Sequence, residues 1–315
     1  MIAEAYPHLA RAAGPLLPLL TDPAIREIRC NSNGRVFAIH SDEGKQEHPA
    51  LDPHQLDGFL ALVADHVGGE WRAQSPRLHA ASPALGLRIQ ASRPPVSPAP
   101  CMTLRKHPNR VYPLPSWVEK GILTVHQHAV IEGLLAAGQT LMFSGAIGSA
   151  KTSLLNACLD WFRGTHKRMV IVEDDPEIVS EVDDCEFQRS VRGLDGQDAI
   201  TTEQLCIDLL RQSPDIVVIG ELRGREALPA TQAFQTGHQG LCTIHARTAK
   251  TTLLRLEQLI QIVSVDPQRA LIAEAINAIV HMEAYGRLWR CTDILAIEPE
   301  LDRSGDYITS SLGKG

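Results

Sequence analysis

The sequence predicts an α/β protein of two domains, a small α+β domain at residues 1–106 and a larger domain built on a parallel sheet at residues 121–315. A chain of 315 residues exceeds the usual single core, so two domains are expected. The first hundred residues carry alternating strand patterns around one amphipathic helix. From residue 140 onward, short apolar runs alternate with helical spacing, the order that produces a parallel sheet.

Composition argues against several classes of protein and site. The net charge of −7 argues against a chain whose main task is to bind phosphate backbones, which needs a basic face. The seven cysteines show no Cys-x-x-Cys pair, so neither a zinc site nor a disulfide framework is expected. No run of eighteen apolar residues and no export signal is visible, and we therefore expect a cytoplasmic protein.

The small domain is predicted from period-two patterns. Ile25–Asn31 and Arg35–His40 alternate apolar and polar residues, and the turn at 31–34 joins them as a hairpin. Pro53–Val67 has the apolar spacing of a helix that covers a sheet. Further strands are expected within Leu78–Ala91 and at Cys101–Arg105, separated by a segment too rich in proline for a central strand.

A proline-rich linker is predicted between the two domains, at residues 107–120. It contains Pro108, Pro113 and Pro115, a composition typical of a stiff, extended segment. Helical spacing resumes at Trp117–Ala137.

The larger domain begins with a phosphate-binding loop. Thr140–Ser144 suits a buried strand and Lys151–Phe162 a helix, with a small-residue loop between them. Its residues match G-x-x-x-x-G-K-[ST], in which backbone N–H groups surround the phosphates, the lysine reaches their outer oxygens and the threonine holds Mg²⁺. The nucleotide-binding residues are therefore predicted to be Gly145, Ala146, Ile147, Gly148, Ser149, Ala150, Lys151, Thr152 and Ser153.

Ala150 departs from this motif, because it stands where the motif has its second glycine. A methyl group is tolerated there only if the backbone keeps a negative φ, or nearly so. Gly148 retains a flexible residue two positions earlier. The substitution keeps open the alternative of a nucleotide-gated scaffold with little turnover.

Two later apolar runs end in acids. Arg168–Asp175 and Asp215–Glu221 are predicted strands that place Glu173 and Glu221 at the carboxyl edge of the sheet, where ligands bind. Glu221 suits the Walker B role, in which an acid bonds a Mg²⁺ water or orients the attacking water. The alternative is a solvated acid at a strand end.

A histidine flanks each end of the next predicted strand, Leu241–Ile244. His238 and His245 lie seven residues apart, and no third metal ligand falls nearby at a usual spacing. A histidine leaving this edge beside the phosphate site could instead donate to the γ-phosphate. A structural role for the imidazole is the alternative.

The ordered motifs, together, resemble a known family. Gly-Ala-Ile-Gly-Ser-Ala-Lys-Thr, Ile-Val-Glu-Asp-Asp-Pro-Glu, the run through Val-Val-Ile-Gly-Glu-Leu-Arg, and Thr-Gly-His-Gln-Gly-Leu-Cys-Thr-Ile-His-Ala span residues 145–246. They resemble the Walker A, Asp box, Walker B and His box of the type II/type IV secretion traffic ATPases. Flanking segments are most similar to the conjugal-transfer TrbB branch.

The resemblance implies an architecture and partners. Members are hexameric rings of subunits with a PAS-like N-terminal domain and a RecA-like P-loop domain. They dock as peripheral proteins on the cytoplasmic face of an inner-membrane secretion or conjugation machine, and their cofactors are ATP and Mg²⁺. No stable direct binding to nucleic acid is expected.

The resemblance also assigns residues. Lys151 and Thr152 match the phosphate and Mg²⁺ contacts, and Glu221 matches the acid that reaches the metal through water. Glu173 matches the Asp-box acid and His245 the His-box histidine. Arg88 and Arg105 match arginines of the N-terminal domain that lean over the nucleotide, although without the resemblance both would be surface charges. Arg223 is expected to assist.

The predicted function is hydrolysis of MgATP to power pilus assembly or substrate transfer by a conjugative type IV secretion system. Three alternatives stay open besides it. A pilus extension or retraction motor differs only in the machine it serves. A RecA-type motor stimulated by nucleic acid is disfavoured by the acidic balance and the 4% aromatic content, which leaves few stacking platforms. The third alternative is the nucleotide-gated scaffold.

Overall fold

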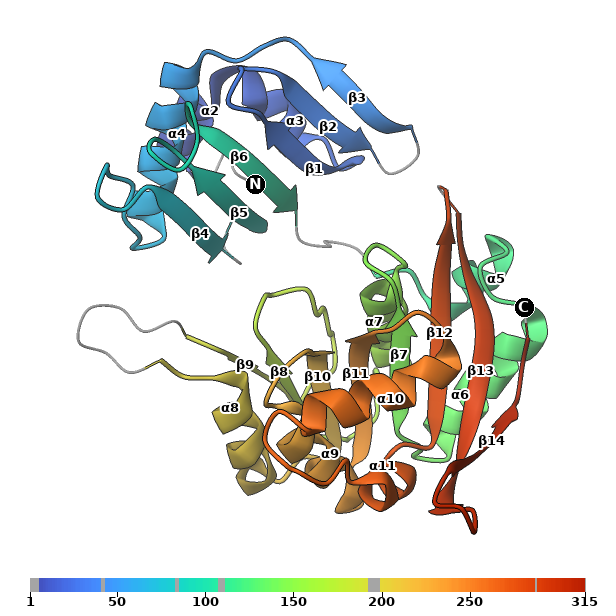
Figure 1. Ribbon diagram of the computed structural model, residues 1–315. Helices are drawn as coiled ribbons and strands as arrows, with labels where there is room; N and C mark the ends of the chain where they lie inside the picture. Colours follow the sequence, from blue (N-terminus) through green and yellow to red (C-terminus); the bar gives the residue numbers. More distant parts are fainter. Residues whose placement is uncertain are drawn as a thin grey trace. The chain divides into compact units, whose positions relative to one another are not determined.

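The computed structural model describes residues 6–40, 43–82, 85–106, 111–191, 199–286 and 288–314. The chain divides into two compact units, Met1–Asn109 and Arg110–Gly315. Each unit has its own sheet and its own core (Figure 1).

The first unit is a six-stranded antiparallel sheet in the order β3-β2-β1-β6-β5-β4. The predicted hairpin is present, since β1 pairs with β2 from Ile25 to Val36. The third strand was not predicted, because its sequence, Gly-Lys-Gln-Glu-His, contains no apolar residues that could alternate with polar ones. The strands are β1 Ile25–Cys30, β2 Val36–His40, β3 Gly44–His48, β4 Arg77–Ser82, β5 Leu87–Ser92 and β6 Cys101–Lys106.

Helices cover one face of this sheet. They are α2 Pro7–Ala13, the 3₁₀ turn η1 Gly14–Leu16, α3 Leu17–Thr21 and α4 Pro53–His66. The predicted apolar stripe of α4 is buried, with Leu60 fully inaccessible, and it packs in one core with Ile28, Ile89 and Leu104 of the strands. The intervening strand residues, among them Arg29, Arg88 and Arg105, therefore lie on the other face.

The linker predicted at 107–120 is wrong in its second half. Leu114–Glu119 forms helix α5, with Pro115 in the first turn. Proline is compatible with that position, because a first-turn N–H has no helical partner. Trp117 is buried in the core of the second unit and donates its indole N–H to the Tyr112 carbonyl at 2.9 Å. Pro108 lies outside the described residues.

The second unit is an eight-stranded sheet in the order β14-β13-β12-β7-β11-β10-β8-β9. The pairs from β12 through β9 are parallel, as predicted, and β13 and β14 add antiparallel strands at one edge. The strands are β7 Leu141–Gly145, β8 Met169–Glu173, β9 Cys185–Arg189, β10 Ile216–Leu222, β11 Gln239–His245, β12 Ala278–Tyr285, β13 Leu288–Leu301 and β14 Tyr307–Ser311.

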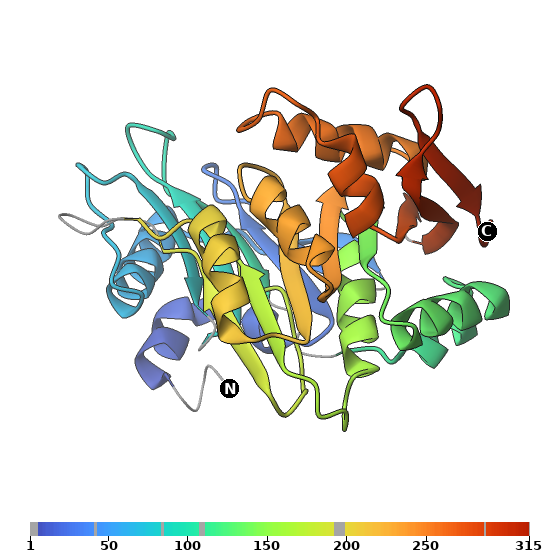
Figure 2. The ribbon, with the colours of Figure 1, turned by 90° about the horizontal axis from the view of Figure 1, so that it is seen from below.

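Alternate strand residues enter two separate cores, one on each face. Phe143 and Ile171 pack with the helices α5, α6 Val125–Ala136 and α7 Lys151–Asp160. Met142 and Val170 face the opposite way and pack with the other helices, which are α8 Thr202–Asp208, η2 Leu209–Gln212, α9 Ala227–Gln235, α10 Ala249–Ile260 and α11 Arg269–Ala275. Figures 1 and 2 show the green and the orange helices on opposite sides of the sheet. Such a double covering explains why the central strands β7 and β8 are buried at every position.

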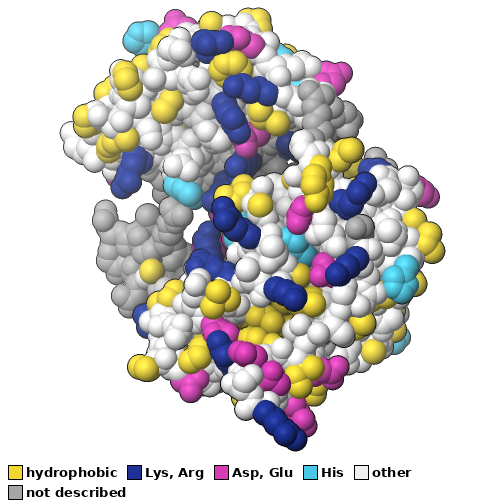
Figure 3. Space-filling view, turned by 45° about the vertical axis from the view of Figure 1, so that its right-hand side comes forward, with side chains coloured by type: hydrophobic (Ala, Val, Ile, Leu, Met, Phe, Trp, Pro, Cys, Tyr) yellow, Lys and Arg dark blue, Asp and Glu magenta, His cyan; other side chains and the backbone are white. Residues whose placement is uncertain are grey.

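Charges of both signs are interspersed over the visible face of the second unit (Figure 3). That visible face therefore carries no extended basic surface of the kind that follows a phosphate backbone. Within the described ranges, no helix has the length and apolar character needed to cross a membrane.

Candidate phosphate-binding site

The predicted loop joins the end of β7 to the start of α7, in the middle of the second sheet. At Gly145 a side chain is impossible, because a Cβ atom there would lie 2.2 Å from the Met282 carbonyl oxygen of the neighbouring strand. The loop then leads to the N-terminus of a ten-residue helix, whose free N–H groups and positive dipole end favour an anion.

Ala150 adopts the left-handed region, with φ 65° and ψ 19°. A negative φ, which was expected to be the condition for a methyl group at this position, is therefore not observed. Gly148 is also left-handed, with φ 77°, and this alternation turns successive N–H groups toward one concave side, as in anion-binding nests. The conformation is imposed by the tight turn into α7, and an alanine in it costs about 1–2 kcal/mol.

Lys151 begins α7 and is 7% exposed. Its ammonium lies 3.1 Å from Nδ1 of His245. Burial lowers the pKa of Lys151, while the charges of Glu221 and Glu177 oppose the shift. A partly desolvated cation at a helix N-terminus gains most from an anionic ligand, which would restore the interactions that burial removes.

His245 ends β11 and is the register partner of Gly145. Its Nε2 lies 3.0 Å from Oε1 of Glu221, which projects near the end of β10. In the tautomer that donates from Nε2 to Glu221, Nδ1 accepts from Lys151. A doubly protonated ring would instead donate from Nδ1 to the Gly145 carbonyl, 3.2 Å away. Lys151 of α7, His245 of β11 and Glu221 of β10 are therefore joined by consecutive contacts, with His245 in the middle.

Glu173 does not join this chain of contacts. Its side chain is 1% exposed, and Oε2 accepts the backbone N–H groups of Glu177 and Ile178 at 3.0 and 2.9 Å. Oε1 accepts from Arg189 Nε at 2.9 Å. Burial raises the pKa of Glu173 and these hydrogen bonds oppose it. The contacts show a carboxylate that fixes the segment following β8.

Glu177 was overlooked in the sequence, although it is the second glutamate of Glu-Asp-Asp-Pro-Glu. Its charge is one of the two that act on Lys151. Its backbone is held on both sides, because the N–H bonds Glu173 and the carbonyl accepts from Asn156 Nδ2 of α7 at 3.1 Å. The sequence did contain a signal for Glu177. It is an acid that follows a proline shortly after β8 ends at the ligand edge of the sheet.

The rest of the loop fits a nucleotide with its metal. Ala146, Ile147 and Gly148 are exposed, with Ile147 at 78%. Ser149 is fully buried and its Oγ has no partner among the described residues. Thr152 and Ser153 lie in the first turn of α7. The Thr152 hydroxyl and the Glu221 carboxylate are hard oxygen donors of the kind that Mg²⁺ prefers.

Two of the predicted arginines, Arg105 and Arg223, form ion pairs within their own units. Arg223 forms an ion pair with Asp174. Arg88 and Arg105 are register partners on β5 and β6, and Arg105 Nε lies 2.7 Å from Oε2 of Glu27. Glu27 also pairs with Arg29, so one nearly buried carboxylate holds two guanidinium groups.

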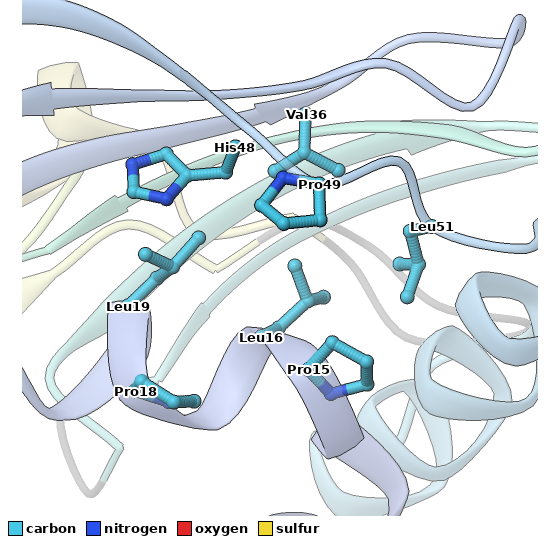
Figure 4. A pocket seen from close by; sticks show the side chains of 8 residues that line it. All are labelled: Pro15, Leu16, Pro18, Leu19, Val36, His48, Pro49 and Leu51. Carbon is cyan, nitrogen blue, oxygen red and sulfur yellow. The ribbon is translucent and has the colours of Figure 1, made fainter.

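An apolar cavity of about 200 Å³ lies in the first unit (Figure 4). Leu16 and Leu19 face Val36 and Leu51 across it, and His48 lies at its side. None of the P-loop residues lines it. His48 is the one polar side chain among its lining residues, and the others are leucine, valine and proline.

Comparisons with known proteins agree with this geometry. Residues 72–292 match the family described as type II/IV secretion system protein. The chain is 30% identical over 303 residues to a probable conjugal transfer protein TrbB of Sinorhizobium fredii, covering 94% of this chain and 91% of the relative. A conjugal transfer protein TrbB of Rhizobium radiobacter is also 30% identical, with 94% and 92% covered.

Solved structures share the fold. The ATPase DotB of Legionella pneumophila has a TM-score of 0.60 at 16% identity, covering 91% of this chain and 76% of DotB. The pilus retraction motor PilT, solved with bound ADP, has a TM-score of 0.61 at 17% identity, covering 96% and 81%. The predicted fold class, a RecA-like P-loop domain preceded by a small α+β domain, is confirmed.

Proposed function

The chain belongs to the type II/IV secretion system protein family, and we propose that it is an ATP hydrolase that powers a conjugative type IV secretion machine. The observation that carries the proposal is the meeting of Lys151, His245 and Glu221 beside the loop that begins α7. The 30% identity to two conjugal transfer proteins over nearly the whole chain supports conjugation over a pilus motor.

The loop and Lys151 would hold the phosphates. Backbone N–H groups of residues 145–152 would bind the phosphates, and the Lys151 ammonium would exchange its His245 contact for phosphate oxygens. Thr152 and Glu221, through water, would hold Mg²⁺, which neutralises charge on the β- and γ-oxygens when bound. Catalysis then depends on positioning and on charge stabilisation.

The imidazole and two partly buried acids, Glu221 and Glu177, would act on the attacking water and the γ-phosphate. With Lys151 withdrawn to the phosphates, Nδ1 of His245 becomes available, while Nε2 stays on Glu221. Glu221 then orients the water, and Glu177 supplies the second carboxylate near the lysine. We assign Glu177 this role in preference to Glu173, whose oxygens are occupied by Arg189 and two backbone N–H groups.

We extend the proposal to the assembly. The chain would form a homo-oligomer, a hexameric ring, on the cytoplasmic face of an inner-membrane conjugation machine. Arg88 and Arg105 would bind the nucleotide, for which Arg105 must leave Glu27. Arg88→Ala and Arg105→Ala should keep ADP binding and lose most of the ATP turnover, and turnover equal to the parent would return both to surface charges.

The test of the hydrolase is phosphate release with ATP and Mg²⁺, with Lys151→Ala as the decisive variant. Removing this ammonium should abolish turnover without loss of folding, because a desolvated charge contributes little to stability. Lys250→Ala, which removes an exposed lysine from α10, is the matched control and should keep parental turnover. Substantial turnover by Lys151→Ala would contradict the site. A parent that binds ATP without releasing phosphate would be a nucleotide-gated scaffold.

A further inference from the structure

The hairpin formed by β12 and β13 contacts the P-loop and the end of β7 at three positions, Ser144, Gly145 and Gly148. His281 Nδ1 lies 2.8 Å from the Ser144 hydroxyl. The Met282 carbonyl lies so close to Gly145 that it excludes any side chain there. On the returning strand, the indole N–H of Trp289 donates to the Gly148 carbonyl at 2.9 Å. The first two contacts involve Ser144 and Gly145 of β7 and fix where the loop starts. The third, from Trp289, is a hydrogen bond to the loop itself.

Trp289 is placed by the sheet rather than by the loop. It lies on β13 as the register partner of Ala284, and β12 in turn pairs in parallel with β7. Its half-buried ring packs against the core that also contains Phe143 and Leu154. The indole N–H is therefore presented from a rigid element to a loop with three exposed residues.

The bond to Gly148 fixes a peptide plane. The Gly148 carbonyl and the Ser149 N–H belong to one planar peptide and point in opposite directions. Holding the carbonyl on the Trp289 side sets the direction of this N–H, which donates to the Ala146 carbonyl at 3.3 Å and closes the turn of the loop. The same peptide lies between the left-handed residues Gly148 and Ala150, of which Ala150 is the non-glycine residue and carries the conformational cost.

We propose that Trp289 is a positioning residue for phosphate binding, which keeps the N–H groups around Ser149 directed at the β-phosphate of a bound nucleotide. The proposal rests on the proposed function, because it takes the loop as the phosphate site. It adds a residue 141 positions along the chain from the loop, on the antiparallel part of the sheet.

Nucleotide affinity tests the proposal. Trp289→Phe keeps an aromatic ring and removes the donor, and loss of one hydrogen bond should weaken ADP and ATP binding alike by about two- to tenfold. The KM for ATP should rise by the same factor and kcat at saturation should change by less than about twofold, because the bond does not depend on the γ-phosphate. Trp161→Phe is the matched control, since Trp161 caps the far end of α7 and packs edge-on against Phe162.

Hydrogen exchange of the P-loop amides gives a readout that needs no nucleotide. Trp289→Phe should speed exchange in residues 146–150, while Trp161→Phe leaves it at the parental rate. If Trp289→Phe unfolds, Trp289→Leu serves the same comparison, because leucine also lacks a donor. Parental affinity and parental exchange in a folded Trp289 variant would overturn the proposal. A parent that binds neither ADP nor ATP would instead overturn the proposed function, and the exchange experiment would still decide whether Trp289 orders the loop.

Discussion

Glu173 and Glu221 lie on neighbouring parallel strands, β8 and β10, and the sequence presents them as equivalent acids at one edge of the sheet. The structure separates them. Glu221 keeps a third of its side chain exposed and bonds the histidine that contacts Lys151, whereas Glu173 is 1% exposed and has hydrogen bonds on both oxygens. Two acids at the same edge of the sheet are therefore not equivalent, because they differ in burial and in the hydrogen bonds that each carboxylate accepts.

Glu221→Gln is the largest effect that this comparison predicts. ATP hydrolysis should fall by about 10²–10³-fold, since a neutral amide can bond the water but cannot polarise it as an anion does. Nucleotide binding and the free energy of unfolding should stay near the parental values, because the side chain is partly exposed. Phosphate release, ATP binding and urea unfolding measure the three quantities. Unchanged turnover would move the role to Glu177, for which Glu177→Gln is the companion variant.

Glu173→Gln should show the opposite pattern. The amide cannot accept from Arg189 while it also accepts both backbone N–H groups, so the free energy of unfolding should fall by about 2 kcal/mol. Turnover at a temperature where the variant is folded should stay within about tenfold of the parent. Urea unfolding and phosphate release on one preparation give both numbers. A stable variant without turnover would restore Glu173 to catalysis and break the comparison.

The pH dependence of the free energy of unfolding gives a further test of the role of Glu173. Burial raises the pKa of Glu173 above its ordinary value of 4.5, so the folded state holds this proton to higher pH than the unfolded state does. The stability linked to Glu173 is therefore fully present below pH 4.5 and is lost as the pH rises through the folded-state pKa. Glu173→Gln lacks this proton, so the stability gap between parent and variant should narrow from pH 4.5 upward. Urea unfolding at several pH values measures the gap, and a gap that widened with pH would mean that Arg189 lowers the pKa of this carboxyl.

The sequence predicted the parts of this molecule that depend on local pattern. The P-loop, the central strands and α4 each follow from apolar spacing or from a motif within a dozen residues. What it could not predict depends on packing between distant segments. The hydrogen bonds that occupy Glu173 come from residues 177, 178 and 189, and Trp289 reaches the loop only through the pairing of β12 with β7. The prediction of a linker was wrong at Pro115, because this proline lies in the first turn of helix α5.

Ala150 gives the smallest predicted effect, and it tests whether the loop beside Glu221 is strained. Its φ of 65° is unfavourable for alanine by about 1–2 kcal/mol, whereas glycine adopts it freely but adds about 0.4–1 kcal/mol of entropy to the unfolded chain. Ala150→Gly should therefore raise the free energy of unfolding by about 1 kcal/mol or less.

Ala157→Gly is the matched control for Ala150→Gly, since Ala157 is buried within the same helix and should lose about 1 kcal/mol. Turnover should persist in both proteins, because neither change removes a charge from the site. If both substitutions destabilised equally, Ala150 would not be left-handed in solution. Turnover found only in Ala150→Gly would mean that the natural loop binds nucleotide without hydrolysing it, and Glu221 would then be an acid placed for a reaction that the alanine prevents.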